Sequence, residues 1–253
     1  MVYITGDTHN DIDASNASSK NIQYCCKAQG ADYKDITNLI LLGDFGLPWY
    51  DCPVDESGIA PLNKSDAHLL KWYNEKPFTI LAVMGNHDNY DMIQKLPEVE
   101  MFGSTVLKVS RNVFYLKRGG VYTIDGKSFL VLGGARSTDA AYRIPHRSWW
   151  EQEAWTEAEK ESLFSMLEKQ GTGFDYVLSH TGPSAGIICA DPSFASGEKQ
   201  KELQEDAAVC LNDRIDRIVS YKKWFFGHWH SDWGFENLIQ ARYVPLYHRG
   251  VAV

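Results

Sequence analysis

Five short polar motifs, each following a run of apolar residues typical of a buried strand, constrain the fold of this chain more than any other feature. They read Gly6-Asp7-Thr8-His9, Gly43-Asp44, Gly85-Asn86-His87-Asp88, Ser179-His180 and Gly227-His228-Trp229-His230. Asp, His and Asn supply the oxygen and nitrogen atoms that divalent metals of intermediate hardness bind. Ligands this far apart in sequence can reach one ion only if the fold collects them at one edge of a sheet.

The apolar runs predict an α/β protein. Strands are expected at residues 2–5, 39–42, 78–84, 128–133, 176–179, 223–226 and 243–253. Most are short continuous apolar runs, the pattern of strands that are covered on both faces. Segments able to form helices, among them residues 65–75, separate the first three strands. The sheet is therefore predicted to begin with parallel strands.

Two helices are predicted in the second half of the chain. One begins at Thr156, where Glu159 completes a capping box, and ends near Gly171. The other is expected over residues 200–221, which carry apolar side chains at helical spacing. Residues 115–125 are typical of a strand or hairpin, with a turn at the paired glycines.

Two long segments have no strand or helix pattern. Residues 133–153 are rich in basic and aromatic side chains, and residues 182–198 are rich in Gly, Pro, Ser and Ala. The second is predicted to be a mobile loop. Loops of this length inside a compact domain are often functional, so both are candidates to border a site.

Composition indicates one soluble domain over residues 1–253, because a chain of 253 residues with 44% apolar and 23% charged residues can bury a full core. The net charge of −8 argues against a stable nucleic-acid partner. Two bound divalent cations would add four local positive charges that this count omits.

The cysteines indicate reduced thiols in the cytoplasm. Cys25, Cys26, Cys52, Cys189 and Cys210 are odd in number and form no C-x-x-C pair, so neither a disulfide framework nor a thiolate zinc site is expected. No signal-peptide pattern and no long apolar stretch is present, so a membrane location is not expected either.

The polar motifs are compatible with a centre of two metals. Asp7 and His9 alternate after the first strand, and Asp44 follows the second, so the carboxyl ends of parallel strands would bring them together. The Trp229 spacer would put His228 and His230 on one side of an extended segment. A turn Asp explains Gly43-Asp44 alone, and a core histidine explains His180 alone. Asn86 offers a neutral carbonyl oxygen, and with it the seven candidate ligands exceed what one tetrahedral zinc needs.

The ordered set of motifs, which spans Asp7 to His230, resembles the pattern of calcineurin-like metallophosphoesterases: Asp-x-His, Gly-Asp, Gly-Asn-His-Asp, His and Gly-His-x-His. The resemblance implies a two-sheet β-sandwich flanked by helices, with the motifs on loops at one edge. It further implies the following roles. Asp7, His9 and His230 hold the first metal, Asn86, His180 and His228 hold the second, and Asp44 bridges them. His87 contacts the phosphate and protonates the leaving oxygen, and Asp88 orients His87.

One departure from the family concerns the phosphate-binding arginine. Protein serine/threonine phosphatases carry an Asp-Arg pair shortly after Gly-Asp, whereas this chain continues with residues 45–49, Phe-Gly-Leu-Pro-Trp. Arg136 and Arg143 are candidates to bind a non-reacting phosphate instead, since a guanidinium matches phosphate geometry. The alternative is that they are solvated or paired with acids such as Asp139 and Glu151.

Aromatic residues in the same segment have two possible roles. Tyr142 is a third candidate for substrate binding. Trp149 and Trp150 are expected to anchor the segment on the core rather than to stack on a nucleobase.

The predicted function is hydrolysis of a phosphomonoester or phosphodiester that depends on two divalent metals, with a hydroxide bridging the metals as nucleophile. Mn, Fe, Zn, Ni and Co all suit this ligand set, so manganese is one of several candidates. A small or nucleotide-like substrate is favoured, because the acidic surface disfavours long polyanions. A nuclease or a phosphoprotein phosphatase of the same fold is an alternative, and a binding module that has lost catalysis is another.

Overall fold

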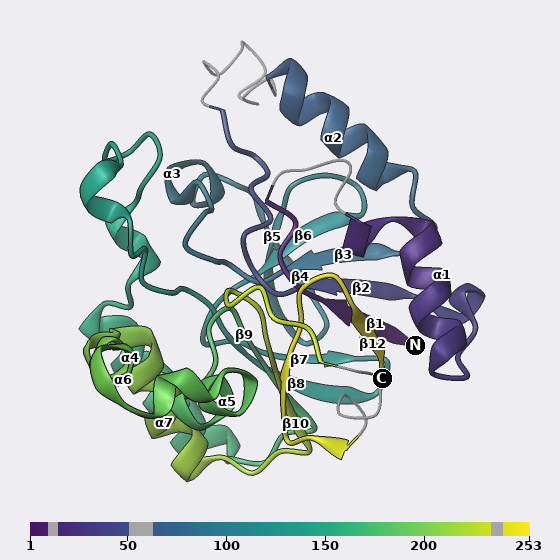
Figure 1. Cartoon of the computed structure of the whole chain (residues 1–253). Coiled ribbons are helices and arrows are strands. Elements are labelled where there is room, and N and C mark those ends of the chain that lie inside the picture. The colour runs from purple at the N-terminus through teal and green to yellow at the C-terminus, as the bar shows by residue number, and fades with distance from the viewer. Residues whose placement is uncertain (10–14, 51–62, 234–239) are drawn as a thin grey trace.

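Two β-sheets pack face to face and carry helices on their outer faces (Figure 1), which confirms the predicted α/β sandwich. The computed structural model describes residues 1–9, 15–50, 63–233 and 240–253, so Cys52 lies outside the described residues. Within these ranges the first sheet has seven strands in the order β12-β1-β2-β3-β6-β5-β4. The second has five strands in the order β11-β10-β9-β8-β7.

The first sheet contains the strands that lead to three of the motifs. Its strands are β1 (Val2–Thr5), β2 (Asn38–Leu41), β3 (Thr79–Ala82), β4 (Glu98–Met101), β5 (Ser104–Lys108), β6 (Val113–Leu116) and β12 (Gly250–Ala252). β1, β2 and β3 are parallel neighbours, with Ile4 opposite Ile40 and Ile40 opposite Leu81. The predicted parallel start of the sheet is therefore confirmed.

The second sheet leads to the other two motifs. Its strands are β7 (Val121–Ile124), β8 (Lys127–Leu132), β9 (Tyr176–Ser179), β10 (Lys223–Phe226) and β11 (Tyr243–Pro245). β8, β9 and β10 are parallel neighbours, with Leu130 opposite Val177 and Val177 opposite Trp224. Their carboxyl ends therefore point the same way.

Three buried clusters hold the layers together. Between the sheets, side chains such as Ile40 and Leu81 pack against Phe129 and Phe225. Helices α1 (Ser19–Ala28) and α2 (Lys64–Asn74) cover the outer face of the first sheet, and the short α3 (Tyr90–Ile93) follows β3 (Figure 1). The outer face of the second sheet is covered by α4 (Glu157–Gln170), α5 (Ser184–Ala190), α6 (Gly197–Glu205) and α7 (Ala207–Ile218).

The 3-10 turns in the described chain are short. They are η1 (Ser15–Ala17), η2 (Tyr33–Asp35), η3 (Ala140–Tyr142), η4 (Glu151–Glu153) and η5 (Pro192–Ala195). None of the helices among the described residues is both long enough and apolar enough to cross a membrane.

The predicted start and end of α4 are confirmed. The Thr156 hydroxyl accepts from the amide of Glu159, and the Glu159 carboxylate accepts from the amide of Thr156, so the capping box is complete. Gly171 follows the helix with a φ of +93°, a backbone conformation that glycine adopts without a Cβ penalty.

The expected helix over residues 200–221 is wrong, because two helices replace it. Asp206 interrupts the run: its backbone is extended, and its carboxylate accepts from the amides of Ala208 and Val209 to begin α7. The expected mobile loop over residues 182–198 is also wrong. It contains α5 and η5, and Ile187 and Phe194 bury their side chains in the cluster under the second sheet.

Two further predictions are right in part only, because the chain crosses between the sheets. The expected strand over residues 243–253 is two strands, of which β11 pairs with β10 and β12 pairs with β1. Residues 115–125 contain the end of β6 and all of β7, so the strand alternative is confirmed, but they are not a hairpin, since β6 and β7 lie in different sheets. The hairpin of β4 and β5 was not predicted, because its charged residues interrupt the apolar pattern.

Candidate metal centre

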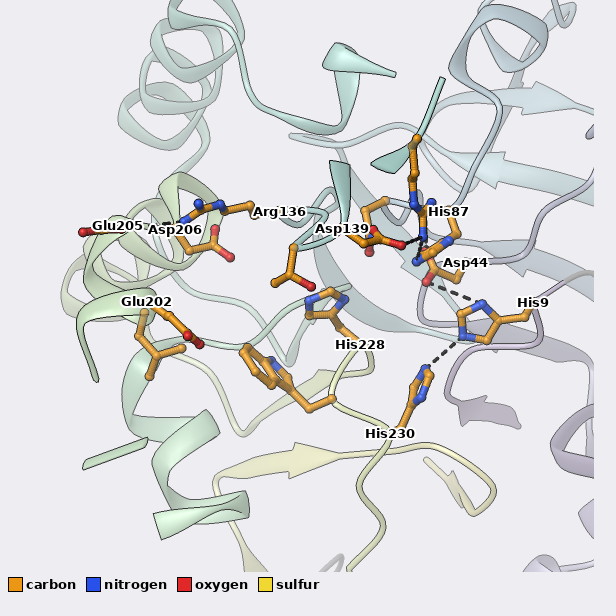
Figure 2. A pocket seen from close by; sticks show the side chains of 15 residues that line it. His9, Asp44, His87, Arg136, Asp139, Glu202, Glu205, Asp206, His228 and His230 are labelled. Atoms are coloured by element: carbon orange, nitrogen blue, oxygen red, sulfur yellow. Dashed lines mark hydrogen bonds and ion pairs between the residues drawn. The ribbon is translucent and has the colours of Figure 1, made fainter. Parts of the chain in front are cut away.

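The carboxyl ends of the parallel strands bring all five motifs to one edge of the sandwich. The loops after β1, β2 and β3 carry Asp7, His9, Asp44, Asn86 and His87, and those after β9 and β10 carry His180, His228 and His230. Figure 2 shows His9, Asp44, His87, His228 and His230 around one pocket. This is the edge at which open α/β sheets place their sites.

Glycines allow these loops to approach the acidic side chains closely. A Cβ added to Gly85 would lie 2.1 Å from Oδ1 of Asp44, and one added to Gly227 would lie 2.1 Å from Oδ1 of Asp7. Any side chain at either position would collide with a candidate ligand. The glycines of these two motifs therefore serve packing around the carboxylates.

His180 lies at the buried base of the site, and its side chain is inaccessible to solvent. Its Nδ1–H donates to the carbonyl of Leu42 at 2.7 Å, which leaves Nε2 unprotonated in the neutral ring. That Nε2 lies 3.2 Å from Oδ1 of Asp44 and 2.9 Å from Oδ1 of Asn86. One imidazole, one carboxylate and one amide oxygen thus converge on the same point.

A second convergence lies closer to solvent. The Nε2 atoms of His9 and His230 are 2.9 Å apart, and His230 Nε2 is 3.3 Å from Oδ2 of Asp7. His9 Nδ1 is 3.8 Å from Oδ2 of Asp44. The ring of Tyr247 stacks on His230 with centroids 4.3 Å apart and so fixes its orientation.

The sequence prediction for Gly227-His228-Trp229-His230 is wrong in its backbone. His228 and His230 have φ values of 67° and 47°, so the segment is not extended and the two rings diverge. The His228 ring lies 4.9 Å from that of His180, whereas the His230 ring faces His9 at 5.0 Å. His228 therefore belongs with the buried convergence and His230 with the outer one.

Four candidate ligands have left-handed backbones. His9 and Asp44 share this conformation with His228 and His230, with φ values between 47° and 67°. Each such residue costs on the order of 1 kcal/mol or more, and such costs concentrate at functional sites. The loops are therefore built to place ligands at the expense of backbone energy.

The electrostatics of the base fit a bound cation. Burial opposes ionisation of Asp44, but the nearby His180, His87 and His9 imidazoles hold the pKa of this carboxyl well below its usual range. Burial likewise opposes the charged form of His180, yet Asp44 and Asp7 raise its pKa to about 10. The carboxylates of Asp7 and Asp44 thus favour a positive charge between them. A divalent cation among them would supply it and leave the imidazole as a neutral ligand.

Burial and the charge of His180 lower the pKa of His228 to about 3, so this imidazole is neutral and able to bind metal. Ligand atoms in three groups of described residues lie within 4.8 Å of one another: Asp7, His9 and His230; His9, Asp44 and His87; Asp7, Asp44 and His180. His228 lies beside these groups, and Asn86 adds the amide oxygen next to His180. The donor set fits metal binding.

His87 lies over the base of the site. Its amide donates to Oδ1 of Asp44 at 2.7 Å, and its Nε2 lies 3.0 Å from Nη2 of Arg143. Burial lowers the pKa of His87 and the Asp44 carboxylate partly offsets this, while the Arg143 charge adds to the lowering.

The described hydrogen bonds of Asp88 do not reach the His87 ring, so its predicted role in orienting His87 stays a prediction. The Asp88 carboxylate accepts from the amides of Gly46 and Gly85, both at 2.7 Å, and from the Tyr115 hydroxyl at 3.0 Å. Burial and the nearby Asp44 raise the pKa of Asp88 to about 6. Asp88 thus holds two motif loops together from beneath.

A pair of residues that sequence reasoning missed holds Asn86. The Asn86 amide nitrogen donates to Oγ of Ser137 at 3.0 Å, which turns the amide oxygen toward His180. The Ser137 hydroxyl donates to the buried carboxylate of Glu153 at 2.6 Å, and the Ser137 amide donates to the same group at 2.9 Å. Both residues lie in the irregular segment 133–153, and no motif marks them.

A pocket of about 600 Å³ opens above the centre. Its lining includes Arg136, Thr138, Asp139 and Arg143 from residues 133–153, and Glu202, Leu203, Glu205 and Asp206 around the end of α6. Arg136 is 52% exposed and lies 3.9 Å from Glu205, whereas Arg143 is 14% exposed and lies 2.8 Å from Asp139. Glu151 pairs with neither arginine among the described ion pairs.

The aromatic candidates in this segment differ in burial, since Tyr142 is exposed and Trp150 is buried. Tyr142 is 92% exposed and is not part of the pocket lining. Trp150 is buried against Trp49 with ring centroids 5.4 Å apart, and its Nε1 donates to Asp91. The predicted anchoring of the segment on the core is confirmed for Trp150.

A family model described as calcineurin-like phosphoesterase matches residues 1–232. A search of curated proteins gave no match. Among solved structures, the sulfate thiohydrolase SoxB of Thermus thermophilus, in complex with glycerol, matches 93% of this chain at 13% identity and a TM-score of 0.35. This chain covers 37% of that protein's chain, so it spans little more than a third of its length.

Proposed function

We propose that this chain, which belongs to the calcineurin-like phosphoesterase family and is a metal-dependent phosphoesterase, uses two divalent cations to hydrolyse a small phosphomonoester or phosphodiester. The position of Asp44 carries the proposal. Its Oδ1 lies 3.2 Å from His180 Nε2, while its Oδ2 lies 3.8 Å from His9 Nδ1. The two oxygens of one buried carboxylate therefore face two separate groups of ligands.

We assign the candidate ligands as the family resemblance implies, an assignment that His230 beside Asp7 and His180 beside Asn86 support. Asp7, His9 and His230 would hold one cation, and Asn86, His180 and His228 the other, with Asp44 shared. When bound, such a pair activates a water and offsets the charge of the phosphoryl oxygens. Asn86 is kept in its ligating orientation by Ser137.

His87 would act on the leaving group. Its amide is fixed on Asp44, and its ring is within hydrogen-bond distance of Arg143 at the pocket side of the centre. A histidine in that place can give a proton to the departing oxygen.

The pocket supports a small or nucleotide-like substrate. Its volume of about 600 Å³ is in the range of small-molecule sites. The wall carries two guanidinium groups, those of Arg136 and Arg143, and four carboxylates, those of Asp139, Glu202, Glu205 and Asp206. A long polyanion would meet net negative charge there, which supports a substrate with few phosphates.

Metal content and hydrolysis of an aryl phosphate test this proposal together. We expect two divalent metals per chain by elemental analysis, activity that chelation removes, and activity that Mn²⁺ restores. A panel of nucleotides, cyclic nucleotides, dinucleotides, phosphopeptides and single-stranded DNA would then define the substrate. One metal per chain would contradict the shared role of Asp44. A strong preference for single-stranded DNA or phosphopeptides would contradict the substrate assignment.

A further inference from the structure

We propose that Arg143 binds the phosphoryl group that reacts, and that Asp139 positions its guanidinium for this purpose. The sequence suggested a non-reacting phosphate as the partner of Arg143 or Arg136, without separating the two. The inference rests on the proposed function, since it assigns a substrate contact within the same site. It makes Arg143 a substitute for the arginine that residues 45–49 lack.

The first observation is the distance between Arg143 and His87. Nη2 of Arg143 lies 3.0 Å from Nε2 of His87, although the two residues come from different loops. A guanidinium has only donors, so Nη2–H donates and His87 Nε2 accepts. If His87 meets the leaving oxygen, a group within 3.0 Å of its ring nitrogen is within reach of the phosphorus-bound oxygens.

The second observation is that the Arg143 guanidinium is held before any substrate arrives. Nη2 pairs with the Asp139 carboxylate at 2.8 Å, and Nη1 donates to the carbonyl of Ser148 at 3.1 Å. Only 14% of the side chain is exposed. A planar, pre-oriented fork loses little entropy when it binds an anion, so this geometry favours phosphate recognition.

Binding would exchange one acceptor for another. A phosphoryl oxygen carries negative charge and accepts a stronger hydrogen bond than an imidazole nitrogen does. The Nη2–H that now reaches His87 can therefore pass to the phosphoryl oxygen, while Asp139 and Ser148 keep the guanidinium in place. His87 Nε2 no longer accepts from Arg143, so it can take up a proton from solvent and pass that proton to the leaving oxygen.

Arg136 lacks these features. It is 52% exposed, and its carboxylate partner Glu205 lies 3.9 Å away. Figure 2 shows Arg136 with Glu205 and Asp206 on the opposite side of the pocket from His87, Asp44 and Asp139. The structure therefore separates two arginines that the sequence left equivalent.

Binding of inorganic phosphate to the metal-loaded protein tests the inference directly. We expect Arg143→Ala to weaken phosphate binding about 10–100-fold by calorimetry, the effect of losing charged hydrogen bonds. Its kcat/KM should fall by a similar factor for aryl phosphates of every leaving-group acidity, while bound metal stays at the wild-type level. Arg143→Lys should recover part of the loss, because a lysine keeps the charge but not the fork.

Two other variants complete the test. Asp139→Asn should weaken phosphate binding severalfold, because the guanidinium keeps its charge but loses the carboxylate that orients it. Arg147→Ala removes the same charge from an exposed position of the same segment, outside the pocket lining, and should behave as wild type.

Three results would overturn the inference. One is wild-type phosphate affinity in Arg143→Ala, and another is a defect confined to substrates with a second phosphate. The third is unchanged phosphate affinity with a defect that grows as the leaving group becomes less acidic, which would mean that Arg143 acts on His87 alone. A wild-type protein that binds metals and phosphate but hydrolyses no ester would overturn the proposed function only, since the phosphate affinities would still report on Arg143.

Discussion

The base of the pocket and its wall are held in different ways. Asp7, Asp44 and His180 at the base are almost fully buried, and each contacts other candidate ligands or the backbone of a motif loop. The wall carries mostly charged side chains and includes the ion pairs Arg136–Glu205 and Arg143–Asp139; it is lined by Arg136, Thr138, Asp139, Arg143, Glu202, Leu203, Glu205 and Asp206. A buried group depends on all of its neighbours, whereas an exposed pair contributes little. Changes at the base should therefore affect every substrate, and changes along the wall only some, with the exception of Arg143, which is mostly buried and contacts His87.

Asp44→Asn should have the largest effect. An amide keeps the shape of the side chain but loses the charge that offsets two cations, so both should bind weakly. We expect a folded protein by circular dichroism, much less bound metal by elemental analysis, and background activity even in excess Mn²⁺. Two tightly bound metals per chain in this variant would falsify the bridging role and remove the distinction between base and wall.

His87→Ala should lower kcat by about 10²–10⁴, the range for loss of a general acid. Bound metal should stay near the wild-type level, because His87 is proposed to act on the leaving group. The defect should shrink for aryl esters with acidic leaving groups, which need little protonation. An equal defect for aryl and alkyl esters, or loss of both metals, would move His87 into the ligand set.

Ser137→Ala tests whether the base depends on residues 133–153. The variant removes the hydroxyl between Asn86 and Glu153, so the amide of Asn86 is no longer held. Metal binding should weaken about tenfold at one of the two positions, the usual effect of a lost orienting partner. Ser165→Ala, on the exposed side of α4, is the control. Identical metal titrations for both variants would show that the orientation of the Asn86 amide does not depend on the Ser137 hydroxyl.

Arg136→Ala should be mild and dependent on the substrate. Because the side chain is half exposed, KM should rise about two- to fivefold for substrates with a second phosphate. An aryl monophosphate should show almost no change. A uniform rise for all substrates would give Arg136 the role proposed for Arg143.

Glu159→Gln should affect stability and leave activity intact. Arg118 contacts Glu159 and also donates to the carbonyls of Gln152 and Ala154. The pair therefore holds the end of the segment 133–153 against the start of α4. Burial opposes ionisation of Glu159, but its hydrogen bonds to Thr156 and the Arg118 charge lower its pKa below the ordinary 4.5. Its contribution is then fully present above that ordinary value and is lost as the pH falls through the lower folded pKa.

We expect the variant to lose about 0.5–1 kcal/mol of unfolding free energy at pH 7, discounted for the exposure of the carboxylate. The difference from wild type should shrink below about pH 4. Urea unfolding at two pH values measures both effects. Glu157→Gln, whose 83% exposed side chain pairs only with Lys160 among the described ion pairs, is the matched control. A difference that grows in acid would contradict the assignment.

The base was predictable because metal binding restricts residue type and position together. A metal ligand must be a side chain such as that of Asp44 or His180, and it must directly follow the carboxyl end of a parallel strand. The same reasoning failed for backbone detail, since the left-handed conformations of His228 and His230 have no apolar pattern to reveal them.

The wall was less predictable because the contacts of its residues depend on how the loops lie in space, and no sequence motif shows this. Ser137 and Glu153 contact a ligand rather than a metal, so neither belongs to a recognisable pattern. Glu205 lies at the end of a helix whose break at Asp206 is masked by apolar spacing that continues through both halves. Arg143 and Arg136 were both predicted as candidates, but the difference in their exposure and in their distance from a carboxylate appears only in the folded structure.

The hydrogen bonds from Asn86 through Ser137 to Glu153 have a consequence for any attempt to change the substrate specificity of this protein. The segment from Ser137 to Glu153 cannot be replaced as a whole by a segment of another protein, because its first and last residues also support the candidate ligand Asn86. A transplanted segment that brings new arginines but lacks a hydroxyl at position 137 or a carboxylate at position 153 would acquire substrate contacts and lose metal together. Insertions and deletions that retune substrate choice should therefore be tolerated between these positions and not across them.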